Sequence, residues 1–404
     1  MTKPERAGRR YVLVFFALVL AGLAGVMVFN VLADPNGAYP RWSLSALAPY
    51  RQQLVTRSAK AEMLLRNRCD VLLLGSSRVQ VGLPVNAKIY GTEQVYNLGL
   101  SGTTLPELAA VLEFALRYQR PKRVLLGTDF FMFSDTRKAT AGFESSRFDP
   151  QLGIFDYHFK NLLGAHALDD SYRLTRQWLR HEQPLGVQRG FLPKSLRASA
   201  SQRETFARCI RRFIIEPETY GAYHYSEERL DLVRQMIRQC RQAQVELFIF
   251  VPPVHALELE TIRAAGLWST FEQWKKDMVR IVAEENAVDA VPFWDFTGFA
   301  GPLIEPVPPA GDRQTRMRWY LENSHFTPAL GERVLNRMLA GTDEKSESAV
   351  FGARLTPATV DQHLTRLRQE REAFAKSQAH EVAWVEQLAR DKGNKNKAGE
   401  GDEL

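Results

Sequence analysis

A serine that follows a short apolar run has the surroundings expected of a nucleophile. Residues 71–74 are Val-Leu-Leu-Leu, and the glycine after them is typical of a buried parallel strand that ends in a tight turn. Ser77 lies just past that turn. In open α/β sheets, ligands bind at the carboxyl ends of the strands. A serine hydroxyl attacks an acyl carbon only when a base removes its proton, so Ser77 needs a histidine from elsewhere in the chain.

Residues 320–328 contain such a histidine. His325 lies shortly before the last helix predicted for the sheet, and Glu322 precedes it by three residues. That spacing lets the carboxylate reach Nδ1 of the same imidazole within one turn, which fixes the tautomer and stabilises the imidazolium. Ser77, His325 and Glu322 therefore predict a triad of nucleophile, base and orienting acid. The alternatives are a plain turn serine at 77 and a structural histidine at 325.

Alternating strands and helices must bring these distant residues together. Short apolar runs predict strands, and capping residues with 3.6-residue periodicity predict helices between them. Alternation of this kind predicts an α/β fold, a doubly wound parallel sheet with right-handed crossovers. The predicted strands are 71–74, 95–98, 123–127, 245–251 and 290–294, and the predicted helices begin near Thr104 and Ser226 or cover 271–284 and 331–339.

Two segments fall outside this alternation. Residues 134–225 are too long for a simple crossover, and we expect a helical insertion beside the sheet, a lid being one role it could have. Its basic residues favour a solvated helix face over an anion-binding patch. In 341–404 we expect a long polar helix to about Arg390 that docks by its apolar stripe, and disorder from Lys392 onward. The basic residues are Arg189, Lys194, Arg197, Arg203, Arg208, Arg211 and Arg212.

The N-terminal segment predicts a membrane span. Residues 11–33 carry no charge and are long enough to cross the hydrocarbon core, and basic residues precede them. The positive-inside rule then places the N-terminus in the cytoplasm and everything from Asp34 onward outside, as in a single-pass protein of the cytoplasmic (inner) membrane with a periplasmic domain. A signal peptide cleaved after Ala33 is the alternative, but the apolar run is longer than usual for one.

These observations divide the chain into five parts. They are a cytoplasmic stub (1–10), the anchor (11–33), a linker with a first helix (34–69), the α/β domain (70–340) with its insertion, and the C-terminal helix and tail (341–404).

Composition excludes several classes of protein. With 404 residues, 45% of them hydrophobic and 25% charged, the chain is neither wholly disordered nor fibrous. A net charge of +7 is small for this length, and we expect no nucleic-acid partner. The cysteines Cys69, Cys209 and Cys240 form no CxxC pair, and the histidines outside the motifs have no metal-ligand spacing, so we expect no metal and no other cofactor. Tryptophans 268, 274 and 294 are expected in the core rather than stacked on sugars.

Four short motifs, in order, resemble those of the SGNH (GDSL-like) hydrolase superfamily. Gly-Ser-Ser-Arg at 75–78 resembles its first block, and Asn-Leu-Gly-Leu-Ser-Gly-Thr-Thr at 97–104 resembles its second. Leu-Gly-Thr-Asp at 126–129 occupies the third, and Glu-Asn-Ser-His at 322–325 resembles the fifth. Each motif alone occurs by chance in many proteins, but the order and spacing extend over residues 70–340.

Within that superfamily the chain resembles especially the membrane-anchored polysaccharide O-acyltransferases and esterases, such as alginate-acetylation proteins and the D-alanyl-transfer protein of Gram-positive walls. The resemblance implies a three-layer α/β/α, flavodoxin-like fold. It also implies a serine O-acyltransferase or acylesterase that acts on acyl esters, acetyl esters above all, of a cell-envelope or exported polysaccharide. The implied partners are the lipid bilayer, a glycan substrate and a membrane-embedded acyl donor protein. The alternative is an inactive scaffold or glycan-binding subunit of a polysaccharide-modifying complex.

The resemblance further assigns the oxyanion hole, with one departure. Backbone N–H groups of Ser77 and Gly102 would hold the oxyanion, together with a side chain at position 129, where the family usually has asparagine. This chain has Asp129 there, and an ionised carboxylate cannot donate a hydrogen bond. One lost donor costs on the order of 100-fold or more in rate. Thr128 or Arg78 could substitute for it, which makes Arg78 a candidate binding residue.

A second departure concerns the acid. Glu322 stands where the family has aspartate, and Asp295, after the fifth predicted strand, is a rival for orienting the imidazole. His255 follows Val-Pro-Pro-Val at the end of the fourth predicted strand. It could line the pocket and bind substrate, or it could be structural. Asp295 and His255 are therefore further candidate binding residues.

Overall fold

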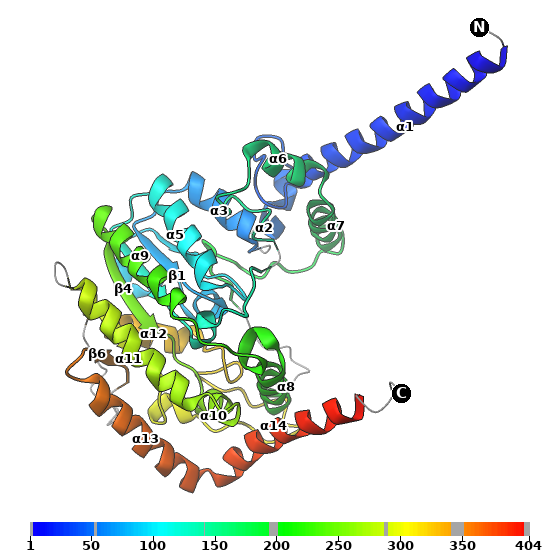
Figure 1. Ribbon diagram of the computed structural model, residues 1–404. Helices are drawn as coiled ribbons and strands as arrows, with labels where there is room; N and C mark the ends of the chain where they lie inside the picture. Colours follow the sequence, from blue (N-terminus) through cyan, green and yellow to red (C-terminus); the bar gives the residue numbers. More distant parts are fainter. Residues whose placement is uncertain are drawn as a thin grey trace. The chain divides into compact units, whose positions relative to one another are not determined.

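The chain folds into two compact units (Figure 1). The computed structural model describes residues 3–51, 55–140, 142–193, 201–286, 290–340 and 351–399, and the side chains of residues 8–391 within these ranges. The first unit combines the chain up to residue 67 with 141–188, and the second combines 68–140 with the chain from 189 onward. The expected insertion 134–225 is therefore divided: its middle belongs to the first unit, and its two ends belong to the second.

The second unit contains the sheet. Its six strands run in the order β2-β1-β3-β4-β5-β6, and the first five in this order are parallel, which confirms the α/β fold. The antiparallel edge strand β6 comes from a region for which we expected only a helix and a tail. The strands are β1 (Val71–Leu74), β2 (Val95–Asn97), β3 (Arg123–Gly127), β4 (Glu246–Val251), β5 (Phe293–Asp295) and β6 (Ala353–Leu355).

Helices cover both faces of this sheet. On one face, α9 contacts both α5 and α11 (Figure 1). The short helix α4 packs against α12. Thr104 begins α5 with a capping box, since its hydroxyl accepts the N–H of Glu107 while the Glu107 carboxylate accepts that of Thr104. The helices are α4 (Ser77–Gly82), α5 (Leu105–Tyr118), α9 (Glu228–Gln242), α10 (Ala256–Ala264), α11 (Trp268–Glu285) and α12 (Pro328–Ala340).

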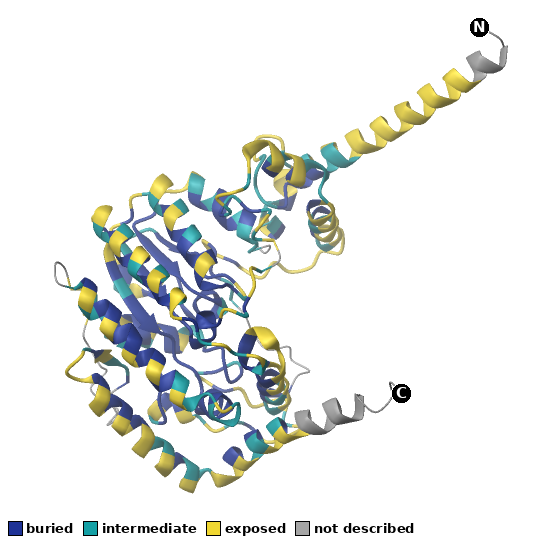
Figure 2. Cartoon of the chain, viewed as in Figure 1, coloured by how far each residue is buried: buried dark blue, intermediate teal, exposed yellow. Residues whose placement is uncertain are grey.

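The core of this unit is the sheet and the aromatic side chains beneath α11. All four residues of β1 have no exposed surface, and Figure 2 shows the strands buried between helices. The ring of Trp274 lies against Phe130, Phe133 and Phe271 at centroid distances of 5.3–5.7 Å. Trp294 stacks on Phe296. These tryptophans therefore pack in the protein, as expected.

The C-terminal segment wraps around the second unit as two helices rather than one. They are α13 (Val360–Ser377) and α14 (Ala379–Gly399), and α14 packs on α10 and on α8 (Gln202–Ile215). The stripe Leu364, Leu367 and Phe374 is buried, as expected of a docking face. The helix α14 extends to Gly399, and the disorder expected from Lys392 onward stays a prediction. Residues 400–404, like Lys194 and Arg197, lie outside the described residues.

Arg203 shows what one basic residue of the expected insertion does. Its guanidinium makes two hydrogen bonds to Glu381 on α14, at 2.8 and 3.0 Å, and lies 3.9 Å from the centre of the Trp384 ring. Arg203 therefore joins α8 to the C-terminal helix and does not serve an anion-binding patch.

The first unit is helical and begins with the apolar helix. Residues 8–33 of α1 are long and apolar enough to cross a membrane, a property that signal sequences share. The segment predicted as a linker folds, since Tyr157 of α6 donates a hydrogen bond to Glu62 of α3 at 2.8 Å. Asn36 similarly donates to Asn161 at 2.9 Å. The helices are α1 (Lys3–Ala33), α2 (Ala48–Arg51), α3 (Arg57–Arg66), α6 (Ile154–Leu163) and α7 (Ala165–Leu179).

Close backbone contacts hold the short helix α4 in the second unit. A Cβ atom at Gly75, where φ is +153°, would lie 2.4 Å from Val79 Cγ2, and one at Gly127 would lie 2.7 Å from the same atom. On the other side, a Cβ atom at Gly331 of α12 would lie 1.9 Å from the carbonyl oxygen of Gly82. The positions of α4 and of its first residue, Ser77, therefore depend on glycine at these sites.

Replacement of Gly331 by alanine should separate α12 from α4. The added methyl group would meet a backbone oxygen that no side-chain rotation can move, and we expect a loss of about 1–3 kcal/mol in the free energy of unfolding. Denaturant unfolding measures this loss. The control is Glu332→Ala, which changes an exposed neighbour on the same helix. Equal stability of the two variants would contradict this account of the contact.

Candidate active site

Ser77 lies where the strand order of the sheet reverses. The strands β2 and β3 flank β1 on opposite sides, so the carboxyl end of β1 is the switch point at which ligands bind in doubly wound sheets. Ser76 follows the strand, and its hydroxyl accepts the N–H of Arg78 at 3.1 Å, which caps α4. Within residues 71–85, Ser77 is the one residue that is not fully buried. The local structure thus presents the Ser77 side chain at the surface of a rigid turn.

The structure brings Ser77 and His325 together. His325 Nε2 lies 2.8 Å from Ser77 Oγ, although the two residues are 248 positions apart. The other ring nitrogen, Nδ1, is hydrogen-bonded to Glu322 Oε1. The loop that carries them is closed by a bridge between Tyr320 and Phe326. A hydroxyl, an imidazole and a carboxylate therefore form a continuous line, which is the arrangement that a Ser–His–acid triad requires.

Glu322 is held as a carboxylate. It accepts the backbone N–H of Ser324 at 2.8 Å and that of His325 at 3.0 Å, in addition to the imidazole. Burial raises the pKa of Glu322, but the charge and hydrogen bond of His325, the thiol of Cys209 and the N–H of Ser324 together hold that pKa well below its usual range. Burial is the main cause that raises the pKa of the Cys209 thiol, and the carboxylate of Glu322 raises it further. The thiol therefore stays protonated. Glu322 can thus stabilise an imidazolium without taking its proton.

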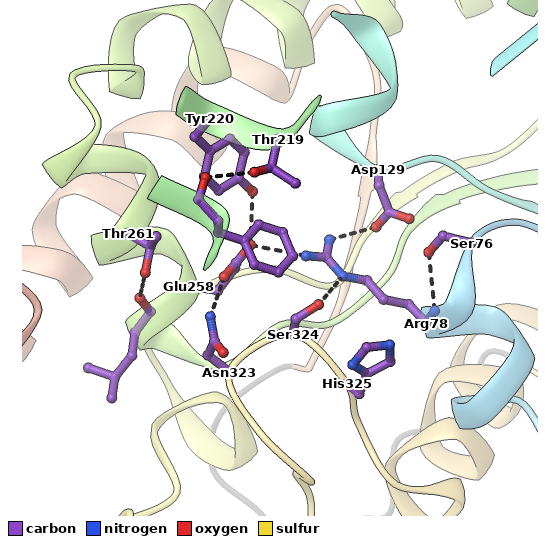
Figure 3. A network of polar contacts seen from close by, with 12 residues as sticks. Ser76, Arg78, Asp129, Thr219, Tyr220, Glu258, Thr261, Asn323, Ser324 and His325 are labelled. Carbon is purple, nitrogen blue, oxygen red and sulfur yellow. Dashed lines mark hydrogen bonds and ion pairs between the residues drawn. The ribbon is translucent and has the colours of Figure 1, made fainter. Parts of the chain in front are cut away.

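Arg78 joins the turn of Ser77 to the loop of His325 (Figure 3). Its guanidinium donates to Asp129 Oδ1 at 2.6 Å, to Glu258 Oε1 at 3.1 Å and, through Nε, to Ser324 Oγ at 3.1 Å. Burial alone would lower the pKa of Arg78, but the two carboxylates raise it above its ordinary value. The residue is 4% exposed. Arg78 is therefore committed to protein partners, and the expectation that it binds substrate or replaces the missing oxyanion donor is wrong.

Glu258 extends this network and was missed by the sequence reasoning. Its second oxygen accepts the side-chain N–H of Asn323 at 2.5 Å, while Tyr220 donates to its first oxygen at 2.8 Å. Burial raises the pKa of Glu258, and Arg78 opposes that rise. One carboxylate of α10 thus contacts both Arg78, the residue after Ser77, and the loop that carries His325. The signal in the sequence is slight: an acid in the apolar run Ala-Leu-Glu-Leu at 256–259.

The third motif does not supply an oxyanion donor. Asp129 is fully buried, and its Oδ1 serves Arg78. The Thr128 hydroxyl is directed to the carbonyl oxygen of Phe250 at 3.4 Å, and its N–H donates to the same oxygen at 2.9 Å. Thr128 and Arg78 are both engaged in this way, so neither is available as a side-chain donor to an oxyanion. Asp129 is a counter-ion of Arg78 rather than part of an oxyanion hole.

Gly102 lies at the same strand ends as Ser77. Ser76 pairs with Leu100 in a parallel bridge, and Gly102 follows two residues later with φ of +67°. Its carbonyl oxygen accepts hydrogen bonds from Arg137 at 2.6 Å and from Thr140 at 2.8 Å. These bonds fix the peptide groups of the turn. The N–H of Ser77 is the first of α4 and has no acceptor within that helix, so the two backbone donors expected from the sequence remain candidates.

His255 does not line a pocket. It is 3% exposed; Nδ1 accepts the N–H of Leu257 at 3.2 Å and caps α10, while Nε2 is 2.8 Å from the carbonyl oxygen of Glu305. Its backbone N–H donates to Asn323 at 3.0 Å. Burial lowers the pKa of His255 to about 4. The residue is a neutral structural histidine, and its expected role in substrate binding is wrong.

Asp295 belongs to a different cluster. Its Oδ2 accepts hydrogen bonds from Lys275 at 2.5 Å and from His363 at 2.8 Å, and its Oδ1 accepts both donors of Thr297. Burial raises the pKa of Asp295, but Lys275 and His363 lower it below its usual range. Glu322, and not Asp295, contacts Nδ1 of His325, so Asp295 does not orient that imidazole.

Replacement of Asp129 by asparagine tests its role as a counter-ion. Asparagine has nearly the same shape but leaves Arg78 with a single carboxylate, so we expect the free energy of unfolding to fall by about 1–3 kcal/mol. The control is Asp135→Asn, which alters an exposed pair with His224 and should change stability by less than about 0.5 kcal/mol. A more stable variant with faster acyl transfer would instead identify Asp129 as a defective oxyanion donor.

His255 predicts a pH dependence of stability. A histidine whose folded-state pKa lies below its unfolded value stabilises fully above the unfolded pKa of 6.5, and this contribution is lost as the pH falls towards 4. We expect the wild type to lose up to about 3 kcal/mol more over this window than His255→Asn, which keeps a capping acceptor. Urea unfolding across the window measures the difference. Parallel profiles would show that His255 is charged in the folded state.

Comparisons with known proteins do not identify the site. No family model and no curated protein matches the chain. One solved structure, described as "The structure of a putative platelet activating factor from Streptococcus pneumonia", is 10% identical and covers 72% of this chain and 94% of its own. Its TM-score is 0.32. A likeness of that size carries no argument, so the interpretation of the site depends on its geometry.

Proposed function

We propose that the chain is a serine enzyme that transfers an acyl group through a covalent intermediate on Ser77. The single observation that supports this proposal most strongly is the 2.8 Å contact between Ser77 Oγ and His325 Nε2 at the switch point of the sheet. The carboxylate of Glu322 on the other imidazole nitrogen supports it further. A turn serine and a structural histidine would not need this alignment.

The reaction begins with attack of Ser77 Oγ on the acyl carbonyl carbon. His325 Nε2 takes the hydroxyl proton, and Glu322 stabilises the imidazolium that forms. The N–H groups of Ser77 and Gly102 hold the oxyanion. When the tetrahedral intermediate collapses, His325 returns the proton to the leaving alcohol, and the acyl group remains on Ser77. A second alcohol or water then repeats these steps in reverse order, which gives transfer or hydrolysis respectively.

The buried charges behind the triad act as positioning groups in this mechanism. Arg78 contacts Ser324, the residue before the base, and Glu258 contacts Asn323. Neither needs to touch substrate. Both fix the loop so that the imidazole stays in line with Ser77, and orientation of this kind contributes a large part of catalytic rate.

We further propose a substrate class from the resemblance of the motifs, namely acyl esters of a cell-envelope or exported polysaccharide. The apolar helix α1 supports a location at the cytoplasmic membrane, with the α/β unit on the extracytoplasmic side. A membrane-embedded protein would then be the acyl donor. Protease accessibility of the α/β unit from the outer side of spheroplasts tests the location, and digestion only after lysis would contradict it.

A second candidate function is an inactive scaffold or glycan-binding subunit. Asp129 favours it, because this position lacks the side-chain donor that the motif usually supplies, and the neighbouring Thr128 and Arg78 are engaged elsewhere. Two backbone donors would then have to stabilise the oxyanion alone.

A fluorophosphonate probe separates the two functions. An activated serine attacks the probe, so we expect the full chain to be labelled and Ser77→Ala to lose the label entirely. The matched control is Ser269→Ala, which removes an exposed serine from α11 and should leave labelling unchanged. A folded wild-type chain that is not labelled would contradict the enzyme and favour the scaffold.

The same samples distinguish transfer from hydrolysis. An acetylated sugar is offered with and without a second sugar as acceptor, and free acetate and acetylated acceptor are measured. We expect the acceptor to be acetylated by the wild type and not by Ser77→Ala. Release of acetate that the acceptor does not diminish would identify an esterase.

A further inference from the structure

The last turn of α1 is built into the fold of the first unit. Asn30 is the polar residue of the apolar helix; it is 1% exposed, and its side chain donates to the carbonyl oxygen of Leu162 on α6 at 2.9 Å. The carbonyl oxygen of Leu32 accepts the N–H of Leu44 at 2.9 Å. The carbonyl oxygen of Ala33 accepts a hydrogen bond from Arg51 Nε at 2.9 Å. Cleavage after Ala33 would remove a part of this unit, so these contacts favour a retained anchor.

These contacts also locate the membrane surface relative to the unit. Residues 11–25 of α1 are uncharged and all exposed, and these fifteen residues measure ~22 Å at about 1.5 Å per residue, less than the hydrocarbon thickness of roughly 30 Å. From residue 26 onward most of the helix surface is partly or fully covered, and α6 and α7 make the contacts. Helices α6 and α7 therefore lie at the level where the hydrocarbon ends.

Both helices carry exposed apolar side chains, with exposed charged residues beside them. On α6, Phe155 is 87% and Phe159 63% exposed, one turn apart, while Tyr157 points the other way and is buried. On α7, Leu168 and Tyr172 are likewise one turn apart and exposed. Figure 2 shows exposed residues on both helices beside the end of α1. Scattered exposed apolar residues are ordinary, but a group of this size marks an interaction surface.

The loop after α1 adds residues that are typical of a membrane interface. Trp42 is 71% exposed, and Leu44, which is hydrogen-bonded to the end of α1, is exposed as well. Tryptophan is enriched where hydrocarbon meets headgroups. Arg41, Arg176 and Arg180 are exposed in the same unit and can pair with lipid phosphates.

We propose that α6, α7 and the Trp42 loop form a lipid-contacting collar that lies in the headgroup region around the outer end of α1. The collar is continuous with the lipid-facing surface of α1, so the bilayer is the first surface that it meets. Amphipathic helices bind interfaces by burying such a face among headgroups and acyl chains. The proposal rests on retention of α1 in the membrane, and it holds whether or not Ser77 is catalytic.

Nitroxide labels on the full chain test the collar. The native cysteines are buried, so a cysteine introduced at an exposed site can be labelled selectively. The variants are Phe155→Cys, Phe159→Cys and Tyr172→Cys, reconstituted in nanodiscs of phosphatidylcholine and phosphatidylglycerol that hold one copy each. Tyr118→Cys is the matched control, an aromatic residue of α5 in the second unit that is 51% exposed. The intact mass of each sample shows that α1 is present.

Collisions of each label with oxygen, which is enriched in lipid, and with a water-soluble nickel complex report its depth. We expect the ratio of oxygen to nickel collisions to be higher at the three collar sites than at the control, because the collar labels lie in lipid. Collar labels as accessible to nickel as the control would overturn the proposal. If the collar labels are shielded from nickel only in nanodiscs that hold two copies, the face contacts a second copy of the chain. That result would also overturn the proposal. Fluorophosphonate labelling of Ser77 in the same samples reports the proposed function separately.

Discussion

The guanidinium of Arg78 is the group on which the geometry of the site depends. It lies between two buried carboxylates and also contacts Ser324, so one side chain connects the strand end that carries Ser77 with the loop that carries His325. Loss of one member of such a group leaves an uncompensated buried charge, which is strongly destabilising. These contacts of Arg78 therefore favour the one arrangement of turn and loop in which Ser77 and His325 stay in contact.

This constraint gives Asp129 a structural role. A buried arginine with three donors in use needs compensating charge, and Asp129 and Glu258 supply it from β3's end and from α10. An asparagine at 129 could donate to an oxyanion but would not neutralise Arg78. Asp129 thus neutralises a buried charge instead of offering a donor, and in the proposed reaction the oxyanion would be stabilised by backbone N–H groups alone.

Much of the fold and the core of the site could be predicted, because local patterns carry that information. The apolar runs predicted β1, β3 and β4. The three-residue spacing of Glu322 and His325 predicted the contact between these two side chains. The errors came from side chains whose partners lie far away in sequence. Nothing local shows that Arg78 faces Glu258, that Asp295 pairs with Lys275, or that both nitrogens of His255 are engaged. The edge strand β6 was missed because three residues carry little pattern.

The first unit is discontinuous in sequence, and this has a consequence for synthesis. Its core needs α1 and α3 from the start of the chain and α6 and α7 from residues 154–179, whereas the segment between them supplies β1, β2 and β3 to the other unit. During synthesis, half of the strands of the sheet are therefore made before the helical unit is complete in sequence. Once residue 188 has been made, every segment of the helical unit is present, whereas the early strands still lack β4, β5 and β6, so the helical unit can close before the sheet is complete.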